Sequence, residues 1–213
     1  HVNDRFNFSK SNPVLDDEAI TGQLDSGSTI RHLLPMTSLI CLSSATEEVI
    51  KGTEDSFLAT EPPTAKVQGE TGASYVQPIV IGTTALFVQD AGRTIHSLKY
   101  TFDSDAFGGI DLTARSSHLF KGKTVKDWAY QRVPYSVVWT VMSDGELIGL
   151  TFMEEQKVFA WHRHSTDGTF ESVETVREGD ETATYFIVNR TFGGTTKRYI
   201  ERFAPREFTE IRD

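Results

Sequence analysis

Cysteine is nearly missing from this chain of 213 residues, which contains only Cys41. A single cysteine cannot form a disulfide within the chain, so a disulfide-stapled fold is excluded. Cys41 lies in the apolar run LICLSS, which is typical of a buried cysteine that packs as a small hydrophobic residue. No motif of a nucleophilic cysteine surrounds it.

Long apolar runs are also missing. No stretch approaches the roughly 20 apolar residues that a membrane-spanning helix needs, so we expect no membrane insertion. The first residues lack the basic start and apolar core of a signal peptide. They also lack an initiator Met, and we therefore interpret the chain as a processed or trimmed piece of a longer protein.

Basic residues are fewer than acidic ones, 21 against 30, which gives a net charge of -9 and a sequence pI of about 5.2. Proteins that bind nucleic acid tightly use Lys and Arg to displace counterions from phosphates. The composition therefore predicts no specific nucleic-acid binding.

The motifs of common catalytic sites are missing as well. No GxSxG elbow supports acyl transfer, and the glycine-rich pieces at 107–109 and 192–194 lack the Lys-Ser/Thr ending of a phosphate loop. A glycosidase needs two carboxylates in one cleft, and acid clusters are present at Glu154 with Glu155 and at Glu178 with Asp180 and Glu181. These clusters lie in turn segments, where solvated carboxylates are normal. We expect no enzyme, no catalytic residue and no cofactor.

Short alternating runs dominate the sequence, above all between residues 136 and 203. The breaks between them carry turn chemistry, with Asp144-Gly145 and Asp167-Gly168 as two hairpin signals. Connections this short join antiparallel strands, because parallel strands need a crossover of a dozen residues or more. The pattern predicts an all-β fold with one short helix starting near 117–120 and strands at 29–34, 38–42, 47–51, 65–68, 78–81, 85–89, 93–102, 110–114, 137–142, 147–153, 157–164, 169–176, 182–191 and 195–203.

Two regions each hold four predicted strands, at 78–114 and at 136–176. Four short strands in 40 to 50 residues are typical of a β-propeller blade, so we expect antiparallel four-stranded sheets in a β-propeller-like arc. The expected organisation is an extended segment at 1–28, about one and a half blades at 29–114, a connection at 115–135, and one blade plus two strands at 136–213. The expected core comprises Trp139, Leu150, Phe152, Phe159, Trp161, Phe186, Ile200, Ile79, Ile81, Leu86 and Val88.

The run His162-Arg163-His164 is the strongest metal candidate. In a strand the two histidines share one face, while Arg163 shares the other face with Trp161. A zinc site needs further ligands, for which His96 and His118 are the distant candidates. We expect a structural pair instead, whose rings pack on neighbouring strands.

Three consecutive acids, Asp16, Asp17 and Glu18, raise the alternative of a calcium loop, because that ion prefers several oxygens from a compact loop. The spacing lacks the alternating acids and the glycine of a dedicated calcium loop. We therefore expect a solvated acidic loop here.

The runs VVWTVMSDGELIGLTF and VFAWHRH, then Asp167-Gly168 and RYIERF, resemble a family of phage tail structural proteins. The earlier Gly72-Ala73-Ser74, followed by QPIVIGTTALFVQDAGRTIHSLKY, agrees in order and spacing, as does SNPVLDDEAI near the start. The resemblance covers residues 12–203. The family comprises the tail tubular or nozzle proteins of short-tailed phages and their prophage relatives.

The resemblance implies a propeller-like sheet assembly in the virion, made in the host cytoplasm. It also implies a homo-oligomeric ring that contacts other tail proteins and surrounds the channel for DNA ejection. Under it, the structural residues are Trp139, Trp161, His162, His164, Asp144, Gly145, Asp167 and Gly168. The alternatives are a receptor-binding or carbohydrate-active propeller domain of a phage tail, and a propeller interaction domain unrelated to phage.

Overall fold

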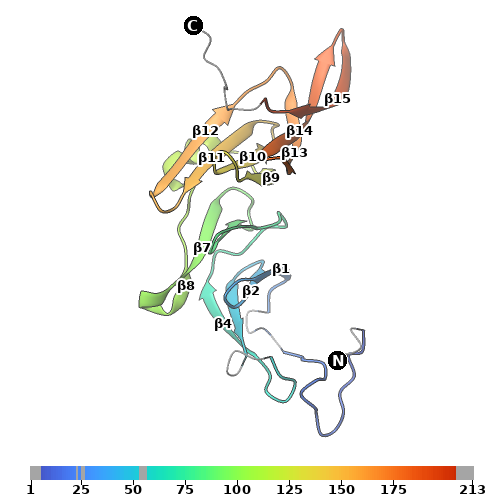
Figure 1. Cartoon of the computed structure of the whole chain (residues 1–213), viewed down its shortest axis with the longest axis vertical. Coiled ribbons are helices and arrows are strands. Elements are labelled where there is room, and N and C mark those ends of the chain that lie inside the picture. Colours follow the sequence, from blue (N-terminus) through green and yellow to red (C-terminus); the bar gives the residue numbers. More distant parts are fainter. Residues whose placement is uncertain (1–5, 23, 25–26, 53–56, 205–213) are drawn as a thin grey trace.

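The computed structural model describes residues 6–22, 24, 27–52 and 57–204. It is 52% strand and 5% helix, which confirms the all-β prediction. The strands form four antiparallel sheets, none of them closed, in which each strand pairs with its neighbours in sequence. Figure 1 shows the sheets following one another along the long axis of the molecule, from the N-terminal segment to β15.

Each of the first three sheets has four strands, and the fourth has three. The first sheet contains β1 (Ile30–Pro35), β2 (Leu39–Ser43), β3 (Glu47–Lys51) and β4 (Thr64–Gly69). The second contains β5 (Ile79–Ile81), β6 (Thr84–Val88), β7 (Ile95–Thr101) and β8 (Ala106–Gly108). The third contains β9 (Val125–Gln131), β10 (Val137–Met142), β11 (Leu147–Met153) and β12 (Val158–His164). The fourth contains β13 (Thr169–Glu178), β14 (Glu181–Phe192) and β15 (Thr195–Arg202).

In the described residues, helical structure comprises the 3-10 helix η1 (Phe102–Ser104) between β7 and β8 and, in the connection to the third sheet, the 3-10 helix η2 (Ala114–Ser116) and the single turn α1 (Ser117–Phe120). The start of α1 agrees with the predicted helix. Phe120 is buried between the second and third sheets, so α1 contributes to the core between these sheets and does not form a separate layer.

Apolar side chains between neighbouring sheets form three core clusters. One joins the first and second sheets through Leu42 and Phe87, and another joins the second and third through Leu86 and Leu150. The last joins the third and fourth sheets around Trp139. The two central sheets thus contribute to two clusters each, and the two end sheets contribute to one each.

The predicted connection at 115–135 is wrong in part, because it contains β9, the edge strand of the third sheet. Trp128 and Ala129 of this strand face opposite core clusters, which its interleaved polar residues concealed in the sequence. The predicted strand at 169–176 therefore starts the fourth sheet and does not complete the third. Residues 29–114 likewise hold two full sheets, not one and a half blades.

The predicted strand at 110–114 is also wrong. The last strand of the second sheet is β8, within the predicted loop, and residue 111 makes only an isolated bridge with His96. Gly109 passes so close to the Ser97 carbonyl that a Cβ atom would overlap with it. After Gly109 the chain still runs beside β7, where Ser97 donates to the Ile110 carbonyl and Leu112 donates to the Ile95 carbonyl, but it forms no regular strand there.

Six of the predicted core residues are buried, and one prediction is wrong. Ile200 is 80% exposed, because it faces away from the stack on the outer side of the fourth sheet. Its neighbours along β14, Phe186 and Val188, point inward. Four predicted residues, Ile79, Ile81, Phe159 and Trp161, are half-buried against the cluster between the second and third sheets.

Candidate functional site

His162 and His164 lie on one face of β12, towards the fourth sheet, as the alternation predicted. The Nδ1 atom of His162 lies 2.8 Å from Nε2 of His164, so one ring donates a hydrogen bond to the other. Both rings pack edge-on against Trp139, with centroids 5.6 and 5.0 Å from it. The pair is therefore part of an aromatic cluster at the joint between the third and fourth sheets.

Trp139 is fully buried at the centre of this cluster. Its indole Nε1 donates to the side-chain oxygen of Gln131 at 2.9 Å. The amide of Gln131 in turn donates to the Thr182 carbonyl at 2.9 Å. A buried indole with its N–H satisfied stabilises the fold, and this chain of bonds links β9 and β10 to the fourth sheet.

The two distant histidines do not join the pair. His96 lies on β7, where its Nε2 is 3.1 Å from the Thr94 hydroxyl, and His118 lies on α1. In the described part of the chain, no group of three His, Cys, Asp or Glu side chains could hold a metal ion. The ligand set that a zinc site needs is therefore not brought together there.

Trp161 faces the opposite side of β12, towards the second sheet. Its indole Nε1 donates to the Leu112 carbonyl at 2.8 Å, and its ring meets Phe120 edge-on at 4.8 Å. Arg163, on the same side of the strand, lies 3.7 Å from Glu146. The strand β12 thus contributes to the joint with the second sheet on one face and to the joint with the fourth sheet on the other.

The two predicted turns lie at the joint between the third and fourth sheets. Asp144-Gly145 closes the β10–β11 hairpin, whereas Asp167-Gly168 connects β12 to β13, which do not pair. Gly145 has φ 83°, and a Cβ atom there would lie 2.5 Å from the Cβ of Thr169. Gly168 has φ 146°, and a Cβ atom would overlap with the Asn189 carbonyl. Both glycines therefore meet a neighbouring strand, in addition to allowing their turns.

Asp144 fixes the first of these turns. Its carboxylate lies 2.7 Å from Lys123 Nζ and accepts from the Glu146 backbone N–H at 3.1 Å. Burial acts to raise the pKa of Asp144, but the Lys123 ammonium and the backbone donor outweigh it and hold the pKa below its ordinary value. Asp167 uses its backbone, whose carbonyl accepts from Arg190 at 2.5 Å.

One backbone hydrogen bond recurs between each pair of successive sheets. A backbone N–H of the chain that enters the next sheet donates to a carbonyl in the central hairpin of the preceding sheet. Ala73 donates to the Ser43 carbonyl at 2.8 Å, Val125 to Gly92 at 2.8 Å, and Phe170 to Gly145 at 2.9 Å. This repeat could not be predicted from the sequence, because the three contacts have the same geometry but no sequence motif in common.

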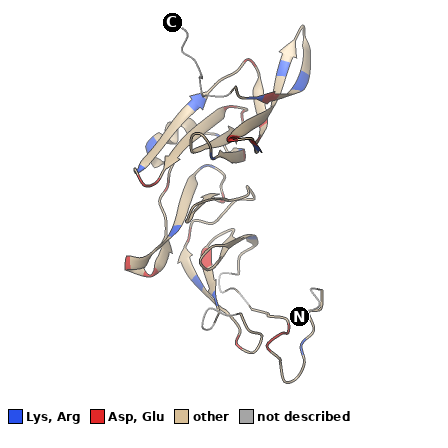
Figure 2. Ribbon diagram, viewed as in Figure 1, with Lys and Arg blue, Asp and Glu red and all other residues tan. Residues whose placement is uncertain are grey.

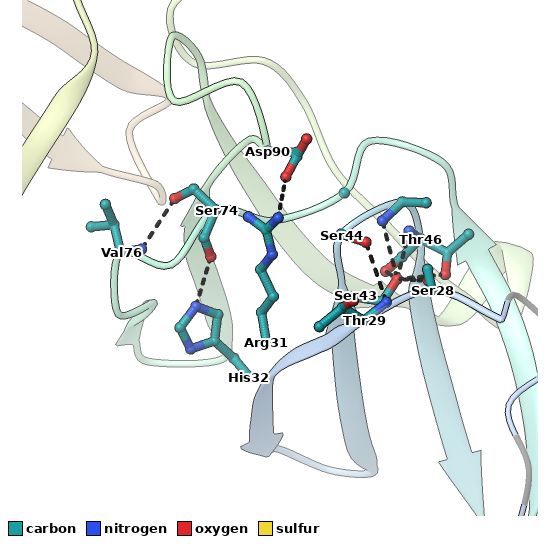
Figure 3. Close-up of polar contacts among 12 residues, drawn as sticks. Ser28, Thr29, Arg31, His32, Ser43, Ser44, Thr46, Ser74, Val76 and Asp90 are labelled. Atoms are coloured by element: carbon teal, nitrogen blue, oxygen red, sulfur yellow. Dashed lines mark hydrogen bonds and ion pairs between the residues drawn. The ribbon is translucent and has the colours of Figure 1, made fainter.

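Several polar contacts lie at the joint between the first and second sheets (Figure 3). Arg31 forms an ion pair with Asp90 at 2.7 Å and lies 4.2 Å over the ring of Tyr75. His32 Nε2 lies 2.8 Å from the carbonyl oxygen of Ser74. These contacts connect β1 to the segment that leads into the second sheet and to the turn between β6 and β7.

Glu47 is a buried carboxylate at the same joint. It accepts from the Gly72 backbone N–H at 2.7 Å and the Thr71 N–H at 3.3 Å. Burial raises the pKa of this carboxyl above its ordinary value, against the two backbone donors. Gly72 has φ 69°, and its contact with the Ser44 carbonyl leaves no room for a side chain. The sequence interpretation used the Gly72-Ala73-Ser74 run only as part of the family resemblance and did not predict this site.

The acids that raised a catalytic or calcium alternative have structural partners. Glu154 accepts from Thr84 at 2.6 Å and from Lys99 at 2.9 Å. Glu178 and Glu181 both bind Arg202, at 2.9 and 2.6 Å. Glu18 accepts from the backbone N–H groups of its own loop, at 2.9 to 3.2 Å.

A shallow groove of about 820 Å³ lies between the second and third sheets, beside Phe152 and Glu154. Hydrolysis of a glycoside requires one carboxyl that stays protonated to act as an acid. Burial acts to raise the pKa of Glu154, but Thr84 and Lys99 hold it below its ordinary value. Glu154 therefore favours the ionised form and does not suit the role of a protonated general acid.

A comparison with models of known protein families found no match, and a comparison with curated proteins found none either. In the described part of the chain, none of the helices has the length and apolar character required to span a membrane.

Proposed function

We propose that this chain is a structural protein of a phage tail, a tube or nozzle component that forms part of the channel for DNA ejection. The observation that carries the proposal is the open stack of sheets. Ile200 is 80% exposed on the outer face of the fourth sheet, and Leu33 is 54% exposed on the outer face of the first. Exposed apolar sheet faces are typical of assembly surfaces.

The stack supports a propeller-like arc as the finer architecture. Each sheet is a meander of short antiparallel strands, and successive sheets pack face to face with the same entering contact at each joint. This is how neighbouring blades pack in a propeller. A ring of several copies, in contact with other tail proteins, is the assembly that the family resemblance implies.

The polar side chains of the joints support a structural role. The ion pair of Arg31 with Asp90 and the hydrogen bond of Gln131 to the Thr182 carbonyl each connect one sheet to the next. Such contacts fix the position of one sheet on the next, which a channel wall needs in order to keep its shape. The proposed location is the virion, after synthesis in the host cytoplasm.

The test is the protein content of purified particles. Particles from a phage or induced prophage that encodes this chain should contain it at several copies per particle, measured by quantitative peptide mass spectrometry. Disruption of its gene should leave filled heads that lack functional tails in electron micrographs. Normal infectious particles without the chain would overturn the proposal.

The alternative of a carbohydrate-active or receptor-binding domain rests on the groove beside Phe152. It predicts that the purified chain binds or cleaves a bacterial surface glycan and that changes at Glu154 abolish this activity. A glycan-binding assay therefore separates the two functions.

A further inference from the structure

The chain between the second and third sheets is basic, although the protein as a whole has a net charge of -9. Residues 112–126 contain no Asp or Glu, and their basic residues are Arg115, Lys121, Lys123 and Lys126. Figure 2 shows Lys and Arg, in blue, along the chain that leads from η2 into β9. This part of the surface therefore favours an anionic ligand.

A surface pocket of about 430 Å³ lies beside this basic segment. Arg93 lines it from the turn between β6 and β7, while His118 and Lys121 line it from α1 and the turn that follows. Ser117 and Gly122 also line it. Pockets of about 300 to 1,000 Å³ are typical of small-molecule sites. Two segments that are distant in the sequence thus bring their basic side chains to one pocket.

The two cations of this pocket are not neutralised by neighbouring acids. Neither Arg93 nor Lys121 forms an ion pair with a residue that the structure describes. Asp90, which lies close to Arg93 in the chain, is paired with Arg31 at 2.7 Å. The guanidinium of Arg93 and the ammonium of Lys121 are therefore available to a ligand.

One acid, Asp111, also lines the pocket. Its carboxylate accepts from the Thr113 backbone N–H at 2.7 Å and from the Thr113 hydroxyl at 2.5 Å, so its own turn holds it. Two fixed positive charges then face one negative charge, and the excess is positive. The remaining acceptor positions of Asp111 and the hydroxyl of Ser117 suit a ligand that carries hydroxyl groups beside its negative charge.

We propose that this pocket binds a phosphate dianion, either free phosphate or the terminal phosphate of a small organic molecule. Arg93 supplies a planar guanidinium that can donate two parallel hydrogen bonds to a phosphate, and Lys121 supplies a compact charge. His118 supplies a further N–H donor. The site goes beyond the tail role proposed above, which does not require it.

Duplex DNA is the less suitable source of phosphate. Each backbone phosphate is a diester with a single charge, and tight binding to a duplex needs many such contacts along it. The pocket offers its two cations at one place, so it holds one phosphate group and gains little from a polymer. A terminal phosphate with two negative charges makes better use of the same two cations.

Titration of the purified chain, followed by two-dimensional ¹H–¹⁵N NMR at constant ionic strength, locates the site. With inorganic phosphate, the amide signals of residues 92–94 and 117–122 should shift and saturate. Sodium chloride at the same ionic strength should give no saturable shift. Ribose 5-phosphate is the second probe. Tighter binding of ribose 5-phosphate would identify an organic phosphate as the ligand, and equal binding would identify free phosphate.

Two variants test the residues of the pocket. Arg93→Gln and Lys121→Gln should each weaken phosphate binding by about tenfold, the usual loss for one charge-assisted hydrogen bond. The matched control is Lys126→Gln, which removes an exposed positive charge of the same segment outside the pocket and should bind like the wild type. Arg93 and Lys121 are exposed, so both variants should fold, and the remaining NMR signals check this.

Three results would overturn the proposal. The first is the absence of saturable shifts up to about 50 mM phosphate, which is weaker than any affinity of biological use. The second is an equal loss of affinity in Lys126→Gln. The third is displacement of bound phosphate by duplex DNA that lacks terminal phosphates, which would show a polymer-binding surface instead. The composition of particles reports the tail role separately, so loss of this site would leave the proposed function standing.

Discussion

The imidazole of His162 occupies the place that a side chain at Gly149 would take. A Cβ atom on Gly149 would lie 2.8 Å from Nδ1 of His162 and would overlap with its Cε1. Gly149 pairs with Trp139 on one side and with His162 on the other. The glycine thus lets the imidazole reach across the sheet to the indole.

Gly149→Ala should therefore destabilise the fold by about 1 to 3 kcal/mol, the usual cost of overpacking a filled core. The ring cannot simply move away, because Trp139 and His164 enclose it. Urea unfolding followed by tryptophan fluorescence measures the effect. Gly108→Ala is the control, since a Cβ atom there meets nothing within 4 Å. Equal stability of both variants would contradict the prediction.

Gly145→Ala should cost more than Gly194→Ala, although both glycines have positive φ, 83° and 78°. The backbone strain is similar at the two turns, about 1 kcal/mol. Only Gly145 faces a neighbour, with the Cβ of Thr169 2.5 Å away, while Gly194 has open space. The melting temperatures of the two variants should differ by several degrees. Equal melting temperatures would contradict the prediction, because they would show that Thr169 moves aside at no cost in stability.

Trp139→Ala should destabilise the chain by roughly 3 to 5 kcal/mol, because the indole is fully buried and loses both packing and its hydrogen bond. Calorimetry or urea titration measures the loss. Phe102→Ala is a matched aromatic deletion at a residue that is 86% exposed, and it should change stability little. An unchanged melting temperature for Trp139→Ala would contradict the observed packing.

The strand meander could be predicted from sequence, because turns and alternation are local signals. The strand β9 could not, because Lys126 and Asp127 interrupt its apolar pattern. Asp127 accepts hydrogen bonds from Ser172 and the Val173 backbone, so its carboxylate serves the next sheet. A polar residue that is satisfied by a distant strand looks like a loop residue in the sequence.

The candidate site could also be predicted only in part from the sequence. Alternation placed His162 and His164 on one face, and turn chemistry found Gly145. Neither signal could reveal which side of the last sheet faces water, so Ile200 was expected in the core. That choice depends on the number of sheets in the stack, which is a property of the whole chain and not of one strand.

Lowering the pH through His96's titration range should weaken the fold. Burial lowers the pKa of this imidazole below its ordinary value of 6.5, against the opposing effect of Asp111. The unfolded chain then binds a proton at a higher pH than the folded chain, so stability falls as the pH drops from 6.5 towards the folded-state pKa. Above 6.5 both states are neutral and the contribution is constant.

The test compares unfolding free energies of wild type and His96→Gln from about pH 8 to about pH 5. The wild type should lose stability relative to the variant as the pH falls below 6.5. His118→Gln, at an exposed position on α1, is the control. Parallel curves for wild type and His96→Gln would show that burial of this ring has no effect on its titration.

The purified chain should show no measurable binding to duplex DNA at about 0.15 M salt. Its net charge is -9, and three of the four arginines on the strands of the fourth sheet already form ion pairs. Arg190 binds Glu201 at 2.5 Å, Arg198 binds Glu171 at 2.6 Å, and Arg202 binds Glu178 and Glu181. A phosphate would have to break these pairs before any counterion is released from the DNA.

The corresponding variant is Glu171→Gln, which frees the guanidinium of Arg198, a side chain that is 72% exposed. Removing this carboxylate should raise the affinity for DNA slightly, with the increase lost at higher salt. A gel-shift series over salt concentration measures both proteins. Micromolar, salt-sensitive binding by the wild type would contradict the prediction. It would also count against the proposed channel role, because a wall that holds DNA this tightly would slow its passage.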